Sequence, residues 1–177
     1  MLIDVYTDGA CSGNPGIGGW GFTIKWPDRE RECFWEATAS TTNNREEIKA
    51  IGNALKRVRE ARGFRRDDRI RIFTDSKLAI NCISGIWKRK KNLDLFPPID
   101  DLLDDTVSFH WVKGHAGNAG NELADTLATY AVQEFREQRR HGLHVLPHDG
   151  PMVGQRDDDV EEVMQWYEAY GENEAAR

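Results

Sequence analysis

The segment FHWVKGHAGNAGNELADTLATYA, residues 109–131, decides the fold class because it joins two kinds of element. Its first half is an apolar run typical of a strand, and its second half has the apolar spacing of an amphipathic helix. Between them lies His115, flanked by Gly114 and Gly117, and ten residues later comes Asp125, which we expect in the first turn of the helix. A histidine needed for packing would not be placed on so loose a tether. The segment therefore predicts a functional side chain between a strand and a helix.

The alternation of strand and helix patterns extends over most of the chain and predicts an α/β protein. Strand patterns occupy residues 2–10, 20–26, 30–40, 69–75 and 107–113. Helical patterns occupy residues 41–63, 76–86, 96–105 and 118–139. The Gly/Pro-rich segment 11–19 is predicted as the turn between the first two strands. Short turns imply an antiparallel meander of the first three strands, so we expect a mixed sheet of about five strands with helices on its faces.

The composition is that of a soluble globular protein, with 177 residues of which 39% are hydrophobic. No apolar run approaches the ~20 residues that span a bilayer, and the first residues lack the basic start of a signal peptide. Cys11, Cys33 and Cys82 form no CxxC pair, which argues against a disulfide framework or a zinc site. We therefore expect a monomeric protein of the reducing cytoplasm, with no membrane partner.

The net charge of −6 is concentrated at one end of the chain. Residues 1–139 hold 21 basic and 21 acidic side chains, whereas residues 140–177 hold 3 basic and 9 acidic ones. The body is therefore neutral, and its basic run WKRKKN at residues 87–92 can still attract a polyanion locally. On composition alone, a solvated loop is the simpler interpretation of that run.

Four acidic residues stand at the ends or edges of predicted elements: Asp8, Glu47, Asp75 and Asp125. Each alone is typical of a turn or a helix start. If the two long helices pack beside the first and fourth strands, the four carboxylates can converge. Such a cluster raises the pKa values of its members unless cations neutralise it, and an all-oxygen ligand set suits Mg²⁺. Two such ions about 3.5–4 Å apart can activate water and stabilise a leaving oxygen, which makes phosphodiester hydrolysis a candidate chemistry.

The neighbouring acids Glu46 and Glu47 are distinguished by helical geometry. The large apolar residues of this helix are Ile48, Ile51, Leu55 and Val58. At about 100° per residue, Glu47 lies roughly 60° from the centre of that stripe and Glu46 roughly 160° away. We therefore expect Glu46 to face water and Glu47 to lie at the edge of the sheet.

Four blocks of this sequence resemble the motifs of the bacterial-like, type 1 ribonuclease H family, in that family's order and spacing. They are YTDGACSGNPG at 6–16, TTNNREE at 41–47, FTDSK at 73–77 and WVKGHAGNAGNELAD at 111–125. The resemblance covers about residues 1–140, which we expect to be the catalytic domain. Residues 141–177, a Pro/Gly linker and an acidic helix candidate that is either disordered or able to dock a partner, have no counterpart in it.

The resemblance implies the ribonuclease H fold and an endonuclease that hydrolyses the RNA strand of RNA–DNA hybrids. It implies two Mg²⁺ ions, with Mn²⁺ as a substitute, products with 5′-phosphomonoester ends, and a role in removing RNA primers and R-loops. The family's metal-binding acids fall on Asp8, Glu47, Asp75 and Asp125. Its mobile histidine falls on His115, whose imidazole would exchange protons near the attacking water or the leaving group.

The resemblance also implies which residues bind the substrate. Asn14 and Asn43 match positions that contact RNA 2′-hydroxyls, the groups that distinguish RNA from DNA. Thr42 and Asn92 match the two sides of a pocket for a DNA phosphate. Such contacts read no bases, so broad sequence tolerance is expected. Many family members carry a basic, tryptophan-bearing handle before the position of Asn92, and here GIWKRKK at residues 85–91 is all that stands in its place.

Three alternatives remain open at this point. A transposase, integrase or junction resolvase of the same broad fold would also gather acids on the sheet. A reverse transcriptase fragment would carry the same motifs. A hybrid-binding module without activity would share the fold. Such a module would not need the four acids for catalysis, whereas all four are present in this sequence.

Overall fold

The structure, a computed structural model, describes residues 1–141. It contains five strands: β1 (Leu2–Gly13), β2 (Gly16–Lys25), β3 (Glu32–Thr41), β4 (Arg69–Thr74) and β5 (Val107–Trp111). The helices are α1 (Asn43–Arg59), α2 (Lys77–Ile83), the 3₁₀ turn η1 (Leu93–Leu95), α3 (Phe96–Asp100) and α4 (Ala119–Arg140). The predictions for the linker and the acidic segment at 142–177 lie outside the described residues.

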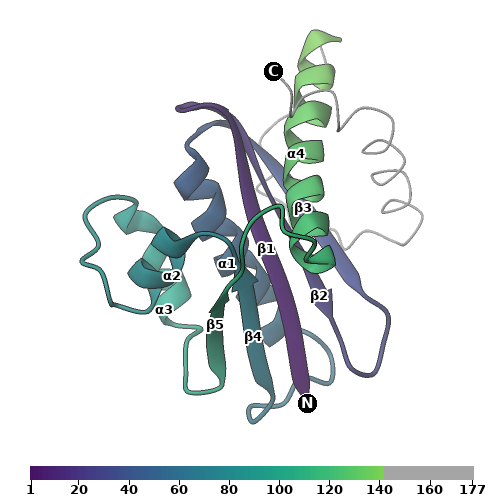
Figure 1. The fold of residues 1–177 in the computed structure, drawn as a ribbon, viewed down its shortest axis with the longest axis vertical. Coiled ribbons are helices and arrows are strands. Elements are labelled where there is room, and N and C mark those ends of the chain that lie inside the picture. The colour runs from purple at the N-terminus through teal and green to yellow at the C-terminus, as the bar shows by residue number, and fades with distance from the viewer. Residues whose placement is uncertain (142–177) are drawn as a thin grey trace.

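The five strands form one mixed sheet in the order β3-β2-β1-β4-β5 (Figure 1). β1 pairs antiparallel with β2, and β2 pairs antiparallel with β3. β4 lies parallel to β1 on its other side, and β5 lies parallel to β4. The predicted meander and the mixed five-stranded sheet are confirmed. Because β1 is central and parallel to β4, the ends of these two strands lie together.

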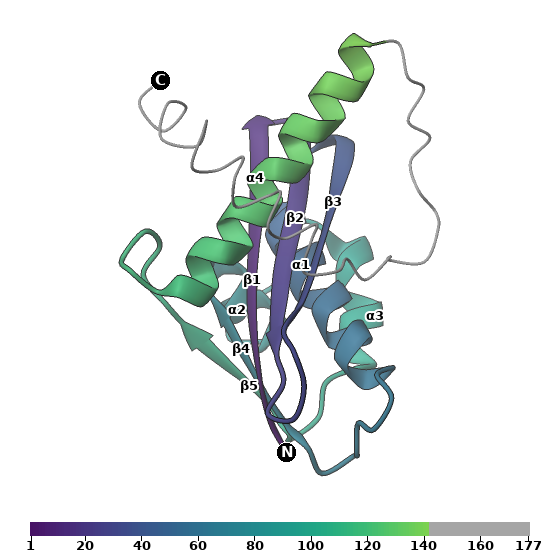
Figure 2. The ribbon, with the colours of Figure 1, turned by 90° about the vertical axis from the view of Figure 1, so that its right-hand side faces the viewer.

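Helices cover the two faces of the sheet unequally (Figures 1 and 2). α1 packs on one face across β1 and β2, and α2 and α3 lie on the same side. α4 packs on the opposite face across β1, β2 and β3. The main core lies under α1, where Trp20, Phe22 and Phe34 stack in series. Among residues 1–141, no helix therefore covers β4 and β5 on the face where α4 lies over β1, β2 and β3 (Figures 1 and 2).

The first hairpin is tighter than the sequence indicated. We expected a turn over residues 11–19, but β1 continues to Gly13 and β2 begins at Gly16, so the turn consists of Asn14 and Pro15, which are joined by a cis peptide bond. Gly13 takes a φ of 84°, a value that side-chain-bearing residues rarely adopt. Gly16 pairs with Thr41 at the end of β3, which brings the hairpin tip beside the start of α1.

Residues 84–92, between α2 and η1, form a loop without a helix, in the segment where the sequence predicts a shortened handle. Arg89 anchors this loop by donating to the Cys82 carbonyl at 2.8 Å and to both Asp100 oxygens at 2.6 and 2.7 Å. Its guanidinium also lies 4.3 Å from the centre of the Phe96 ring. The lysines on either side, at positions 88, 90 and 91, are exposed. Arg89 therefore anchors a loop that presents three exposed lysines.

Two further sequence predictions are tested by the described residues. All three cysteines are free. Within residues 1–141, no helix has the length and apolar character needed to cross a bilayer.

Candidate active site

Asp8 lies on the central strand β1, on the face that α4 partly covers, and is 7% exposed. Its strand neighbour Gly9 and its cross-strand partner Gly21 bring both long helices close. A Cβ at Gly9 would lie 2.7 Å from the Glu46 carbonyl carbon in α1. A Cβ at Gly21 would lie 2.7 Å from the Ala124 carbonyl oxygen in α4. Because Gly9 and Gly21 have no side chains, α1 and α4 can approach the sheet closely beside Asp8.

Asp75 comes directly after β4, level with Asp8. Tyr6 pairs with Phe73 in the parallel ladder, and each aspartate follows two residues later. The Trp111 indole N–H of β5 donates to the Asp75 carbonyl at 3.0 Å, and the Lys77 ammonium lies 4.3 Å from the centre of that indole ring. The parallel register therefore places the two carboxylates side by side, and β5 holds the Asp75 backbone.

Glu47 reaches the same place from the first turn of α1. The Asn43 amide donates to its Oε1 at 2.8 Å, and the Ser76 hydroxyl donates to its Oε2. Ser76 also caps α2 by accepting from the Ala79 N–H at 3.2 Å. Both Glu47 oxygens are thus held by hydrogen bonds, which orients the carboxylate toward Asp75.

Asp125 lies in the second turn of α4, one turn later than expected, and His115 lies in the loop before that helix. The His115 Nδ1 is 3.8 Å from the Asp125 Oδ2, while the imidazole is 81% exposed. His115 has a φ of 51°, in the left-handed region that few residues adopt. The Gly117 N–H donates to the Glu122 carboxylate at 2.9 Å, which ties the loop to α4. The histidine is therefore within reach of the acids yet open to solvent, as the glycine-flanked tether predicted.

The negative charges of the four acids act on one another. Burial raises the pKa of Asp8 well above its ordinary value, and the charges of Asp75, Asp125 and Glu47 raise it further. Burial and the Asp75 charge raise the pKa of Glu47, against hydrogen bonds from Ser76 and Asn43 that lower it. Burial also raises the pKa of Asp125, and the Asp75 charge adds to that, while His115 lowers it. The site thus holds more negative charge than its own side chains balance.

This donor set fits hard divalent cations. Its oxygens all come from carboxylates, the ligands that Mg²⁺ prefers, and among residues 1–141 no lysine or arginine forms an ion pair with any of the four acids. Within the same residues, no three side chains already stand in the mutual arrangement of a complete metal site. The four acids therefore form an acidic cluster that a cation would draw together, and not a preformed cage.

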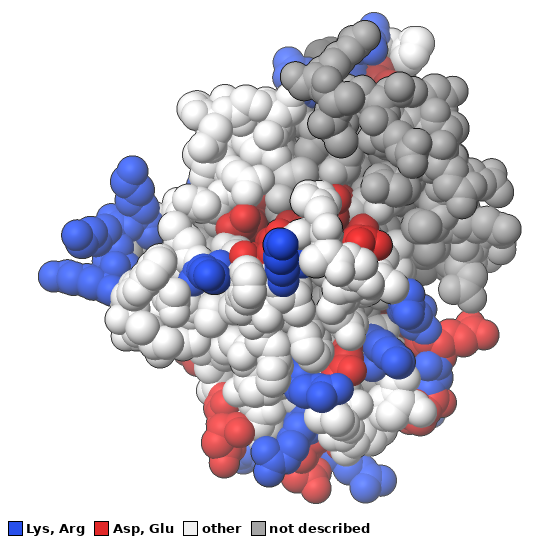
Figure 3. Space-filling view, in the orientation of Figure 1, with Lys and Arg blue, Asp and Glu red and all other residues white. Residues whose placement is uncertain are grey.

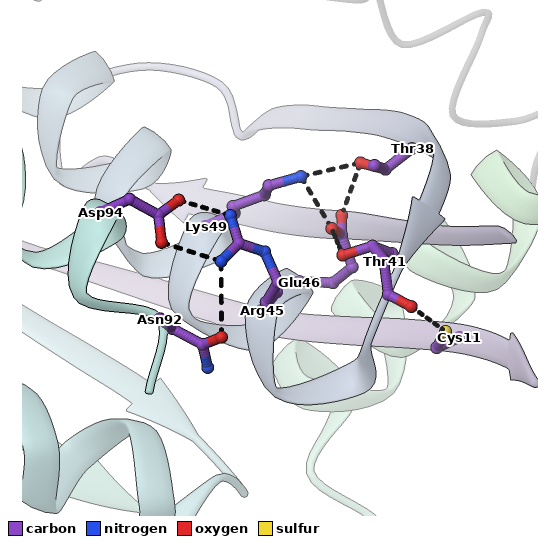
Figure 4. A network of polar contacts seen from close by, with 8 residues as sticks. All are labelled: Cys11, Thr38, Thr41, Arg45, Glu46, Lys49, Asn92 and Asp94. Atoms are coloured by element: carbon purple, nitrogen blue, oxygen red, sulfur yellow. Dashed lines mark hydrogen bonds and ion pairs between the residues drawn. The ribbon is translucent and has the colours of Figure 1, made fainter. Parts of the chain in front are cut away.

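The prediction that Glu46 faces water is wrong. Its side chain is fully buried, and its carboxylate accepts from Thr38 at 3.1 Å, from Thr41 at 2.7 Å and from Lys49 at 2.8 Å (Figure 4). The error came from counting large apolar residues alone. Ala50 and Ala54 are also fully buried and extend the buried face of α1 toward Glu46. Glu47 still occupies the acidic cluster, because it points along the sheet edge.

The predicted substrate residues surround the acids at the start of α1. Asn14, at the hairpin tip, is exposed, and Thr42 precedes α1 without capping it through its side chain. Asn43 donates to Glu47, which leaves its carbonyl oxygen able to accept a hydroxyl proton. On the other side of α1, Asn92 has a φ of 57° and accepts from Arg45 at 3.4 Å. The pairing of Gly16 with Thr41 places the hairpin that carries Asn14 beside the strand end that precedes Thr42 and Asn43, and Arg45 links Asn92 to the start of α1.

Sequence reasoning missed three residues that support the site. Ser76 orients Glu47, and Trp111 holds the Asp75 backbone. Arg45 binds Asp94 through two hydrogen bonds of 2.9 and 2.5 Å and so fixes the loop that carries Asn92. Ser76 had a signal, because a serine after a strand-end acid is a typical helix cap. The partners of Arg45 and Trp111 are distant in the sequence, so no local pattern indicated these contacts.

The charged surface agrees with this arrangement. Figure 3 shows acidic side chains gathered near the middle of the face, within largely uncharged surface, with lysine or arginine side chains beside them. A separate basic group protrudes at the left edge, where Figure 1 places the loop between α2 and α3. An acidic centre is therefore flanked by cations on the side of the truncated handle.

Comparisons with known proteins identify the family of the chain. The RNase H family model matches residues 2–133. A protein named ribonuclease H from Bartonella quintana is 40% identical over 151 residues, which cover 77% of this chain and 92% of that protein. The crystal structure of RNase H1 from the archaeon Halobacterium salinarum superposes with a TM-score of 0.63 at 29% identity, over 76% of this chain and 99% of that one.

A further solved structure shares the fold. LC11-RNase H1, determined in complex with an RNA/DNA hybrid, has a TM-score of 0.66 at 24% identity and covers 76% of this chain and 99% of that one. The family match covers most of the described residues and includes every acid of the cluster. The chain therefore belongs to the RNase H family, and within it to type 1.

Proposed function

We propose that this chain, an RNase H enzyme, cuts the RNA strand of RNA–DNA hybrids with two divalent cations held by Asp8, Glu47, Asp75 and Asp125. The observation that carries the proposal is the unbalanced charge of these four acids, three of which have raised pKa values. A fold gains nothing from such repulsion, so a function requires it. Bound Mg²⁺, or Mn²⁺ in its place, would supply an activated water and stabilise the leaving oxygen.

The protein's own residues orient this chemistry. Asp8, between its two glycine neighbours, is the most buried member and provides the centre of the ligand set. Ser76 and Asn43 hold both oxygens of Glu47, so that its carboxylate presents fixed lone pairs. Carboxylate oxygens that hydrogen bonds already hold lose little freedom when they bind cations, and cations held in place would stabilise the negative charge that develops in the transition state.

His115 is placed to move a proton rather than to hold the ions. Its ring is exposed and lies 3.8 Å from Asp125, so it can reach the edge of the cluster and turn back to water. A mobile base beside the reacting phosphate can take a proton from the attacking water or give one to the leaving oxygen. Because it is not fixed, it would not retain the cleaved phosphate.

Substrate choice would come from two sides of the cluster. Asn14 and Asn43 are placed to contact 2′-hydroxyls of the RNA strand, while Thr42 and Asn92 would bind a phosphate of the DNA strand. The exposed lysines of the loop at 84–92 add a cation-rich edge for the same polyanion. LC11-RNase H1 was determined with an RNA/DNA hybrid, which supports this choice of substrate for the shared fold.

Cleavage of a labelled hybrid in Mg²⁺ tests the proposal, with duplex DNA and duplex RNA as substrate controls. Asp8→Asn should abolish cleavage, and Asp4→Asn provides the matched control. Asp4 lies on the same strand and face, but its carboxylate is paired with Arg71 at 2.6 and 2.7 Å. We expect cuts in the RNA strand alone, with 5′-phosphate ends. Tight hybrid binding without cleavage would instead support a non-catalytic module, and cleavage of duplex DNA would support a transposase-like nuclease.

A further inference from the structure

Three consecutive charged residues near the start of α1, Arg45, Glu46 and Glu47, have different partners, and Figure 4 shows those of Arg45 and Glu46. Glu47 points into the acidic cluster, and Arg45 reaches Asp94 and Asn92. Glu46 turns toward the end of β3, where the hydroxyls of Thr38 and Thr41 donate to its two oxygens. Lys49 completes the group by donating to Glu46 at 2.8 Å and to Thr38 at 2.9 Å. The Glu46 carboxylate thus has a full set of partners and no contact with the acidic cluster.

The partner that matters is Thr41, because it joins three parts of the proposed substrate surface. Thr41 precedes Thr42 and Asn43 in the chain, and it pairs with Gly16 beside the hairpin tip that carries Asn14. The Cys11 thiol lies 3.5 Å from its carbonyl oxygen. A Cβ at Gly18 would lie 3.0 Å from the Glu46 side chain, so nothing but glycine leaves room for this carboxylate. Glu46 therefore fixes the junction of β3, α1 and the hairpin.

Stability alone does not require a carboxylate at this position. Removing a carboxylate from water costs more than burying an apolar side chain of similar volume, and the ion pair with Lys49 returns that cost only in part. The neighbouring buried positions of α1 are apolar, as in Ile48, Ala50 and Ile51. A carboxylate differs from an apolar side chain because its hydrogen bonds with two hydroxyls and an ammonium fix the orientation of the end of β3.

We propose that Glu46 is a positioning residue for the substrate: it holds Thr41 so that Thr42, Asn43 and Asn14 meet the hybrid in a fixed arrangement. This inference rests on the proposed function, since it concerns the same cleft. Glu46 does not touch substrate and supplies no ligand to the cations. Its loss should therefore weaken hybrid binding and leave the rate of the chemical step nearly unchanged.

Steady-state cleavage of a hybrid by wild type, Glu46→Met and Glu46→Gln tests this. Glu46→Met fills the space but offers no acceptor, so KM should rise roughly 5- to 20-fold, as expected when a buried charged hydrogen-bond network is lost, with kcat within about 2-fold. Glu46→Gln keeps an acceptor for Thr41 and should restore most of the KM. The dissociation constants of the same hybrid should rise and fall with the KM values. They are measured in Ca²⁺, because a binding measurement does not require cleavage.

A second pair of variants guards against a general loss of folding. Thr41→Val removes the donor at the junction, whereas Thr23→Val alters another buried threonine of the same strand pair, far from the junction and bonded to Cys33. Both should lower the melting temperature, but Thr41→Val alone should raise KM and the dissociation constant. Equal KM values for the two valine variants, or a lower melting temperature of Glu46→Met with wild-type KM, would show that Glu46 is structural. A wild type that neither binds nor cleaves the hybrid would instead overturn the proposed function, and the inference with it.

Discussion

Two buried carboxylates stand on either side of Gly9, and their surroundings are opposite. Asp8 accepts one hydrogen bond among the described residues, from the Gly9 N–H at 2.7 Å, and faces three other acids. Glu46 is even more deeply buried, yet two hydroxyls and the Lys49 ammonium surround it. Charge balance, and not burial, therefore distinguishes Asp8, whose negative charge is left for cations to neutralise, from Glu46, whose charge is neutralised by its own partners.

The same contrast occurs along a single strand. Asp4 and Asp8 lie on the same face of β1, and Arg71 of the neighbouring strand neutralises Asp4 through two hydrogen bonds. The ladder ends at Tyr6 and Phe73, and two residues beyond that pair Asp8 faces Asp75, an acid in place of a base. Over four residues of β1, the partner of an aspartate on this face thus changes from a neutralising arginine to other acids. Variants that remove one charge at a time should separate these roles.

The largest effect is expected for the acids of the cluster. Asp8→Asn, Glu47→Gln and Asp75→Asn should each reduce hybrid cleavage by roughly 10³-fold or more, because each removes a ligand oxygen charge that the cations need. Asp4→Asn and Glu46→Gln should keep kcat within about 2-fold of wild type. Single-turnover rates in saturating Mg²⁺ provide the measurement. Equal losses for Asp4→Asn and Asp8→Asn would remove the distinction between balanced and unbalanced acids.

His115→Ala should give the next largest effect, a decrease of roughly 10²-fold in the single-turnover rate, because general acid–base assistance is lost while the ligand oxygens remain. The His115→Ala variant keeps Asn118, which caps α4 from the same loop, so the start of the helix is preserved. A His115→Ala enzyme as inactive as Asp8→Asn would make the histidine part of the ligand set. A rate equal to that of wild type would exclude a role in proton transfer.

A smaller effect is expected from pH. Raised pKa values mean that Asp8, Glu47 and Asp125 begin to bind protons above the ordinary carboxyl range near ~4, and protons compete with cations. The Mg²⁺ concentration that gives half-maximal activity should therefore rise as the pH falls toward the range in which these carboxyl groups bind protons. The measurement is a Mg²⁺ titration of the initial rate at several pH values. A half-maximal concentration that does not change with pH would contradict the account of these carboxyl groups.

The smallest effect is predicted for the acidic segment beyond the described residues. Residues 140–177 carry the whole net charge of −6, so ending the chain near Arg140 should tighten hybrid binding at low salt without a change in kcat. At ~0.15 M salt the screening length is about 8 Å, and most of the gain should fade. Hybrid affinity at two salt concentrations checks this. A truncated chain that melts several degrees lower, with no salt-dependent gain, would show that the segment packs on the body.

The sheet could be predicted from local patterns, because strand periodicity and short turns implied the meander. The acidic cluster could not be predicted from patterns alone, because the parallel placement of β4 beside β1, which brings Asp8 and Asp75 together, joins distant segments. Glu47 and Asp125 lie at the edges of their helices' apolar stripes, and the resemblance to type 1 ribonuclease H motifs assigned all four acids to one site. The glycines on both sides of His115 indicated that it lies in a loop.

The errors arose where a small residue or a distant partner decided the outcome. Helical periodicity counted Ile48 and Leu55 but not the buried alanines, so Glu46 was placed in water. Gly9 and Gly18 make the space that Glu46 occupies, and glycine has no hydrophobic signal to reveal that. The ion pair of Arg45 with Asp94 spans 49 residues, a separation at which a single sequence carries no pairing information.

The central claim is that Asp8 belongs to an unbalanced cluster and Glu46 to a balanced one, and thermal melting tests it most directly. A carboxyl whose folded pKa is raised destabilises the fold once it is ionised, so at pH 7 in EDTA Asp8→Asn should melt above wild type, by roughly 2–4 °C for each kcal/mol of repulsion relieved. That advantage should shrink as the pH falls toward ~4 and Asp8 becomes protonated in wild type. Glu46→Gln should melt below wild type throughout, because it loses the ion pair with Lys49. Added Mg²⁺ should raise the melting temperature of wild type and of Glu46→Gln, but hardly that of Asp8→Asn. If Asp8→Asn melts below wild type in EDTA and Mg²⁺ shifts all three proteins equally, Asp8 is an ordinary structural carboxylate and the account is wrong.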